Sequence, residues 1–187
     1  MKFVRQIRFI LVLENNPVFL NKSFFQIFYH IYKNNYLLGV AMEILEFNGE
    51  GIKFQYLSNW REQNKDAFGP NCIWSLVRVL EGNPSTITVS KNDAGEVVAI
   101  ASIQENMEKS FESQGWNIVD SKILNLNGNP VLFIVADAED SGRVLENKTT
   151  FIIKNGFMYI FELMHFKEFP HAYDDYLNML NSLEFIN

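Results

Sequence analysis

The chain has 187 residues, of which 48% are hydrophobic and 20% charged, enough for one globular domain with a substantial core. Residues 1–41 have a net charge of +4 and residues 42–187 a net charge of −10, and an acidic domain repels phosphate backbones, so we expect no nucleic-acid binding. The single cysteine, Cys72, excludes an intrachain disulfide and any multi-cysteine metal site. It is compatible with a reducing compartment, and we expect a cytoplasmic protein.

Residues 1–41 form an N-terminal extension without a capped helix or clean strand alternation. The opening has the basic flank and apolar stretch of a signal peptide, but Arg5 and Arg8 interrupt it and no small-residue cleavage site follows. The uncharged runs are far shorter than the roughly 20 residues that span a bilayer. Three interpretations stay open: a region upstream of a true start at Met42, a membrane-surface segment, or an extra element of the domain.

The orderly part of the chain begins at Met42. Alternating apolar residues predict two short strands on either side of a turn at 48–51, followed by a polar loop at 58–71. Further strands are expected at 73–80 and 86–89.

A long helix is predicted next, with Asp93 as its cap and Glu96 completing a capping box. Its buried stripe would contain Val97, Ile100, Ile103, Met107 and Phe111, and Gly115 would end it.

The C-terminal part is predicted to be a series of antiparallel strands closed by a helix. Strands are expected at 116–126 and 131–136, with a turn at 137–142 before the next strand. Asn155-Gly156, between two apolar runs, is the strongest short-range signal for a two-residue hairpin turn. Strands that are apolar on both sides need cover on both faces, so we expect helices above and below the sheet.

The last helix and its return strand are predicted from a change of period. Tyr173, Tyr176, Leu177 and Leu180 fall on one helical face, and Pro170 suits the first turn. The final stretch, 182–185, would return to the sheet as a short strand.

From Met42 onwards this order of elements resembles the PsbP-like superfamily, which includes the extrinsic photosystem II subunit, the Ran guanine-nucleotide release factor and many microbial proteins. The residues that carry the resemblance are Gly51-Ile52-Lys53-Phe54 with Asn59-Trp60, Asn127-Gly128-Asn129-Pro130, Asn155-Gly156 before Tyr159, and the 173–185 ending. It implies an α+β fold, an α/β/α sandwich around an antiparallel sheet of about six strands with helices on both faces. It also implies a non-enzymatic binding or assembly role.

Few residues are candidates for chemistry. His165 and His171, with acidic residues between them, could bind a transition metal only if further ligands converged, and a structural role is the better interpretation. Cys72 has no neighbouring histidine and is expected to be a buried, inert thiol. The cluster Asp137, Glu139 and Asp140 lacks the spacing of a calcium loop and is expected to be a solvated turn. We therefore predict no catalytic residues, no metal and no cofactor.

Three aromatic residues, Trp60, Phe68 and Trp74, lie in or beside the polar loop. If exposed, they would mark a patch for a partner or an apolar ligand; if buried, they would be a satellite of the core. The prediction is a non-enzymatic binding or assembly module that contacts a protein partner, with acidic charge favouring a basic partner face. The alternative is a small-molecule or lipid carrier with a pocket between the sheet and the long helix, near Trp60 and Trp74. Oligomeric state is open, and no stable membrane span is expected.

Overall fold

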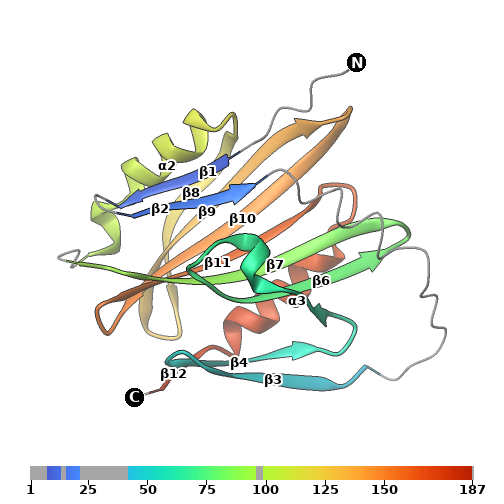
Figure 1. Ribbon diagram of the computed structural model, residues 1–187, viewed down its shortest axis with the longest axis horizontal. Coiled ribbons are helices and arrows are strands. Elements are labelled where there is room, and N and C mark those ends of the chain that lie inside the picture. The colour runs from blue at the N-terminus through green and yellow to red at the C-terminus, as the bar shows by residue number, and fades with distance from the viewer. Residues whose placement is uncertain (1–7, 14–15, 22–41, 96–98, 187) are drawn as a thin grey trace.

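The computed structural model describes residues 8–13, 16–21, 42–95 and 99–186, the first two ranges as backbone only. The predicted domain is a layered α+β sandwich (Figure 1). A seven-stranded antiparallel sheet has the order β5-β6-β7-β11-β10-β9-β8, and a three-stranded sheet has the order β12-β4-β3.

The seven strands of the large sheet are β5 (Arg61–Glu62), β6 (Cys72–Leu80), β7 (Asn83–Asp93), β8 (Asn117–Leu126), β9 (Asn129–Asp140), β10 (Arg143–Lys154) and β11 (Phe157–Phe166). The small sheet contains β3 (Ile44–Gly49), β4 (Ile52–Leu57) and β12 (Glu184–Phe185). The helices are α2 (Gln104–Ser113) and α3 (His171–Asn181), with two 3-10 helices, η2 (Lys65–Phe68) and η3 (Ile100–Ser102).

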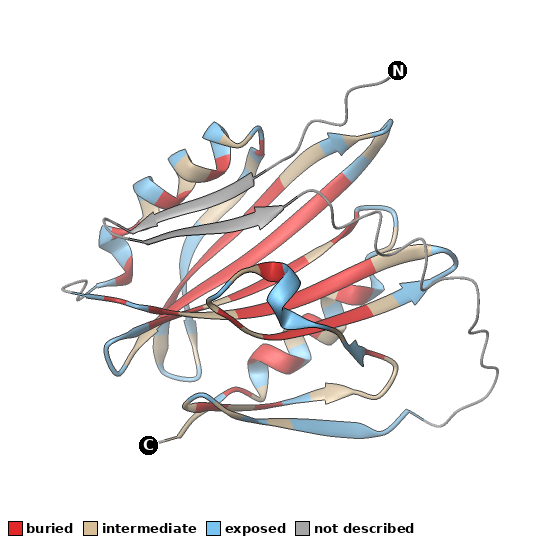
Figure 2. Ribbon diagram, in the orientation of Figure 1, coloured by how far each residue is buried: buried red, intermediate tan, exposed pale blue. Residues whose placement is uncertain are grey.

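Each face of the large sheet has its own core, as the two-sided apolar strands predicted (Figure 2). On one face, α3 and the small sheet bury an aromatic cluster that includes Phe54, Phe161 and Tyr176. On the other face, η3 and α2 bury Ile100, Met107 and other apolar side chains against β9 and β10. We call these the α3 face and the α2 face.

Two-residue turns ending in glycine set the hairpin registers. In the described part of the chain five such pairs have positive φ at both residues: Glu50-Gly51, Glu81-Gly82, Asn127-Gly128, Ser141-Gly142 and Asn155-Gly156. Positive φ at both positions is the requirement of the turn whose twist matches paired strands. Gly51 is required for a second reason, because a Cβ there would lie 2.9 Å from the Tyr159 hydroxyl.

The structure corrects the predicted start of the long helix. Asp93 is the last residue of β7 and pairs with Phe157 of β11, and its side chain accepts a hydrogen bond from Gly95 N at 2.7 Å. The sheet ladder extends to Asp93, so this residue cannot cap a helix, and α2 begins only at Gln104. Glu96 and Val97 lie outside the described residues.

Strand lengths differ from prediction at the 137–142 turn. β9 continues to Asp140 and the turn contracts to Ser141-Gly142, because the ladder with β10 extends to the pair Arg143 and Asp140.

In the N-terminal extension, where no strand alternation was predicted, β1 (Arg8–Leu13) and β2 (Asn16–Asn21) pair with each other as a two-stranded sheet. The start-site and membrane-surface interpretations of residues 1–41 stay predictions.

Candidate functional site

The aromatic patch suggested by the sequence is buried. Trp60, Phe68 and Trp74 have exposed fractions of 2%, 2% and 5%, so they form no exposed surface. Trp60 Nε1 donates to Asp175 Oδ2 of α3 at 3.0 Å, and the Trp74 ring meets Phe54 edge-on at 4.9 Å between centroids. The polar loop folds back onto the α3 face, where Trp60 and Trp74 belong to the main core cluster.

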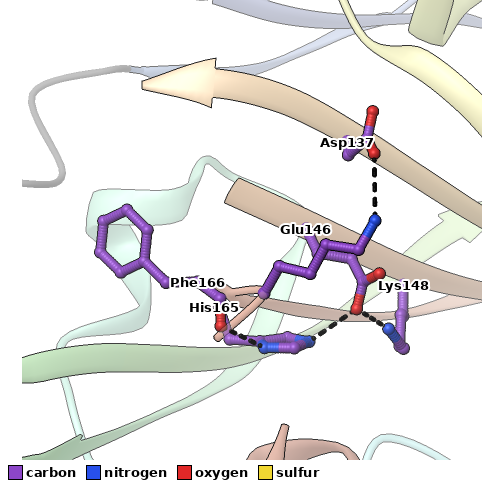
Figure 3. A network of polar contacts seen from close by, with 6 residues as sticks. Asp137, Glu146, Lys148, His165 and Phe166 are labelled. Carbon is purple, nitrogen blue, oxygen red and sulfur yellow. Dashed lines mark hydrogen bonds and ion pairs between the residues drawn. The ribbon is translucent and has the colours of Figure 1, made fainter. Parts of the chain in front are cut away.

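The two histidines do not converge. His165, at the end of β11, is 1% exposed, whereas His171 is exposed at the start of α3. His165 lies in a buried cluster with Glu146 and Lys148 of β10, on the α3 face (Figure 3). Among the described residues no three histidine, cysteine or acidic side chains are placed to hold a metal ion.

In the cluster of Glu146, Lys148 and His165, the lysine and the histidine both approach one carboxylate oxygen. The Glu146 carboxylate forms an ion pair with Lys148, and the same oxygen, Oε1, lies 3.2 Å from His165 Nε2. His165 Nδ1 lies 3.0 Å from the Phe166 carbonyl oxygen. The tautomer of the neutral ring therefore decides which of the two neighbours accepts a hydrogen bond from the ring N–H group.

Burial disfavours the protonated, charged forms of His165 and Lys148. Burial, and next the Lys148 charge, lower the pKa of His165 to about 4, so the ring is neutral at physiological pH. Burial and the Lys167 charge lower the pKa of Lys148 to about 8 despite its ion pair. The cluster is closed off from solvent, and its geometry provides a structural ion pair rather than an accessible acid or base.

A second buried polar group lies on the α2 face of the same strands. Glu162 accepts hydrogen bonds from Asn147 and, at 3.3 Å, from Thr88, and burial raises the pKa of its carboxyl group. From the sequence, Glu162 was considered only as an acidic residue that could join the two histidines in a metal site, and Glu146 and Lys148 had no assigned role. The available signal was their position, because each is a charged residue inside a strand that is buried on both sides.

The remaining sequence candidates have ordinary environments. Cys72 is buried, its Sγ lies 3.3 Å from the Trp74 carbonyl oxygen, and burial raises the pKa of the thiol to about 11. Such a thiol is protonated and inert at neutral pH. Asp137 accepts from Asn117 Nδ2 at 3.1 Å and pairs with Lys167, while Glu139 is exposed.

The exposed apolar side chains with the clearest arrangement lie on β3 and just before it. Met42, Ile44 and Leu45 are 64%, 68% and 36% exposed. β3 pairs with β4 on one side and is the outer strand of the small sheet, where Figure 2 draws it mostly as exposed. An edge strand presents unpaired N–H and C=O groups, and here apolar side chains accompany them.

A shallow apolar hollow of about 320 Å³ lies on the α2 face. Its lining residues are Ala99, Ile100, Ala101, Ile123, Pro130 and Ile153. It lies between η3, which leads into α2, and residues of β8, β9 and β10, and no residue of α2 is among its lining residues. The predicted proximity to Trp60 and Trp74 is wrong, because those residues belong to the core of the α3 face.

No helix in the described part of the chain is both long and apolar enough to cross a bilayer. β3 and β8 are outer strands of their sheets, as are the two-residue strands β5 and β12, and both β3 and β8 have exposed apolar side chains.

Comparisons with known proteins identify the fold. No protein-family model and no curated protein sequence matches the chain. The solution structure of cyanobacterial PsbP (CyanoP) from Synechocystis superposes with a TM-score of 0.61 at 11% identity, covering 83% of this chain and 99% of that one. LpqN, involved in cell envelope biogenesis of Mycobacterium tuberculosis, gives 0.51 at 15% identity, covering 82% and 99%.

The Ran-binding protein Mog1p of Saccharomyces cerevisiae gives a TM-score of 0.50 at 8% identity, covering 80% of this chain and 97% of that one. At these identities the similarity identifies the fold alone. The chain has the PsbP-like fold that its sequence motifs predicted.

Proposed function

We propose that the protein is a non-enzymatic binding module that takes up a strand of a basic protein partner along the open edge of β3. The observation that carries the proposal is the exposure of Ile44, at 68%, on an edge strand that also exposes Leu45, with Met42 exposed just before the strand. Addition of a strand to such an edge gains backbone hydrogen bonds, and the neighbouring side chains provide selectivity.

The charge of the small sheet favours a basic partner. Residues 42–57 together with β12 contain four glutamates, Glu43, Glu46, Glu50 and Glu184, against one basic residue, Lys53. Lys53 is already paired with Glu46 at 3.0 Å. Glu50 also pairs with Lys91 of β7, at 3.5 Å, but the segment keeps a net negative charge. Lysine or arginine side chains on an added strand would meet this charge, which directs association and selects against acidic strands.

The edge is supported from behind by a rigid aromatic core. Phe47 of β3 stacks on Phe54 of β4 with ring centroids 5.0 Å apart, and Phe54 in turn contacts the Trp74 ring. A strand held in place in this way loses little conformational entropy when a partner pairs with it.

The experiment uses two synthetic strand peptides, one alternating lysine and valine and one alternating glutamate and valine. We expect the lysine peptide to bind the full chain, with affinity falling as salt is added, and the glutamate peptide not to bind. Ile44→Lys should abolish binding because it removes an apolar contact and adds a repelling charge. Val144→Lys is the matched control, since Val144 is an exposed aliphatic residue of β10, 39% exposed.

Isothermal titration calorimetry of the three proteins gives a decisive result. Binding of the lysine peptide that survives Ile44→Lys, or that is lost equally in Val144→Lys, would contradict the β3 assignment. Failure of both peptides to bind the unmodified protein would contradict the proposed partner class.

A second candidate function is carriage of a small apolar molecule in the hollow beside η3. Its volume of about 320 Å³ and its lining, which includes Ile100, Ile123 and Ile153, suit a compact apolar ligand. Native mass spectrometry of gently purified protein tests it. A bound mass that is lost in Ala101→Trp, a substitution that would fill the hollow, supports carriage, and a bare chain mass counts against it.

A further inference from the structure

We propose that the chain pairs with a second copy of itself through β8, forming a twofold-symmetric dimer centred on Ser121. β8 is an outer strand of the large sheet, and among the strands that the structure describes it pairs with β9 alone. It is ten residues long, and Val119, Ile123 and Leu124 are 51%, 42% and 42% exposed. This surface is separate from the β3 edge, and the inference does not depend on the proposed function.

The charges of β8 are self-complementary. Asp120 and Lys122 lie on the same side of the strand and form an ion pair of 2.5 Å within one chain. An antiparallel pair with its twofold axis at Ser121 places Asp120 of each copy opposite Lys122 of the other. Opposite charges directly across an antiparallel pair are stabilising, and like charges there are destabilising.

Other twofold registers fail on the same criterion. An axis at Lys122 would place the two Lys122 side chains opposite each other, and an axis at Asp120 would do the same for the two carboxylates. An axis at Ile123 would leave Lys122 opposite Leu124. Only the Ser121 register of these four places both charges opposite their counterparts. A closed twofold arrangement of this kind is isologous and leaves no free edge on β8.

Two features of β8 limit the strength of this dimer. The ladder with β9 shifts register between Ile118 and Asp120, and such a bulge twists an edge strand and shortens its regular part. Gln104 Nε2 of α2 lies 3.5 Å from the Ser121 carbonyl oxygen and must turn away when a second strand arrives. We therefore expect a dimer that forms at high protein concentration and dissociates on dilution.

Charge reversal tests the register directly. Asp120→Lys would place two pairs of lysines opposite each other, and Lys122→Asp would place two pairs of aspartates opposite each other. Each change should weaken the dimer by about tenfold or more, whereas the double variant D120K/K122D should dimerise like the original chain. Both positions are exposed, with side-chain exposures of 41% and 49%, so the variants should remain folded.

The most specific result comes from mixing the two single variants. Each should be monomeric alone, yet an equimolar mixture should form a heterodimer, because every lysine of one then faces an aspartate of the other. Sedimentation velocity from micromolar to near-millimolar protein provides the measurement, with circular dichroism to verify folding. Ile44→Lys should leave dimerisation unchanged.

Each alternative outcome overturns the proposal. Sedimentation of the unmodified chain as a monomer throughout the range would show that β8 does not pair. A dimer that persists in both single variants, or that is lost in Ile44→Lys, would place the interface elsewhere. A mixture of the single variants that stays monomeric would refute the Ser121 register.

Discussion

The two outer strands β3 and β8 differ in the sign pattern of the charges around them. Residues 42–57 together with β12 contain four glutamates against one lysine, whereas β8 presents one acidic and one basic residue, Asp120 and Lys122, two positions apart. An edge with charge of a single sign repels its own copy and attracts a chain of opposite charge. An edge with alternating signs can match itself. Two strands in equivalent edge positions are thus suited to different partners.

The largest effect is expected from removing the core behind β3. Phe54 is fully buried and contacts the rings of Phe47, Trp74 and Phe161. Phe54→Ala should lower the free energy of unfolding by about 3–5 kcal/mol, measured by urea denaturation. Phe157→Ala, at a residue 38% exposed, is the control and should cost far less. Equal losses in the two variants would mean that the aromatic cluster does not support the small sheet.

Lowering the pH should destabilise the fold, because the large sheet, which also contains β8, contains the buried His165. The pKa of this ring is about 4 in the folded chain against an ordinary 6.5, so the unfolded state binds more protons between these values. Stability should therefore fall by up to about 3 kcal/mol as the pH drops through this window. His171→Gln should retain the fall, whereas His165→Asn should flatten it. An unchanged pH profile in His165→Asn would assign the effect to other groups.

Glu162 should give a smaller effect of opposite sign. Its pKa is raised by burial, so its contribution to stability is present at acid pH and is lost as the pH rises through the folded pKa. Glu162→Gln removes the ionisable group, keeps an amide oxygen that can accept from Asn147, and replaces the second oxygen with an N–H group that can donate to the Thr88 hydroxyl. It should raise the melting temperature above neutral pH more than at acid pH. A uniform shift at all pH values would show that the carboxyl group is not the titrating species.

The smallest stability effects should belong to the edges themselves. Ile44→Lys and Asp120→Lys alter exposed positions, and each should change the free energy of unfolding by no more than about 0.5 kcal/mol. Ile44→Lys should nevertheless abolish peptide binding and leave dimerisation intact, and Asp120→Lys should weaken dimerisation and leave peptide binding intact. A large loss of stability in either variant would mean that its effect on association reports unfolding.

Local signals were sufficient to predict most of the fold. Asn155-Gly156 fixed a hairpin because its backbone requirement is independent of distant residues, and both residues have the positive φ it demands. The period of Tyr176 and Leu180 likewise located α3. The cap at Asp93 was predicted wrongly because a long-range ladder with β11 competes for that residue, and no local pattern reveals such a partner.

The candidate surfaces were harder to predict, because they depend on which strand lies outermost. Trp60 and Trp74 stand beside a polar loop in the sequence, and only the fold of that loop onto α3 shows that they are buried. Ile44 belongs to a strand predicted correctly, but its exposure follows from the order β12-β4-β3. The pairing of Glu146 with His165 also required the β10–β11 register.

Amide hydrogen exchange of the unmodified chain tests the contrast between the two edges most directly. Exchange would be followed by mass spectrometry in peptides from β3 and β8, at low and high protein concentration and with the lysine–valine peptide. The account predicts that raising the protein concentration slows exchange in β8 alone and that the peptide slows exchange in β3 alone. Exchange that responds in the opposite strand, or in neither, would contradict it.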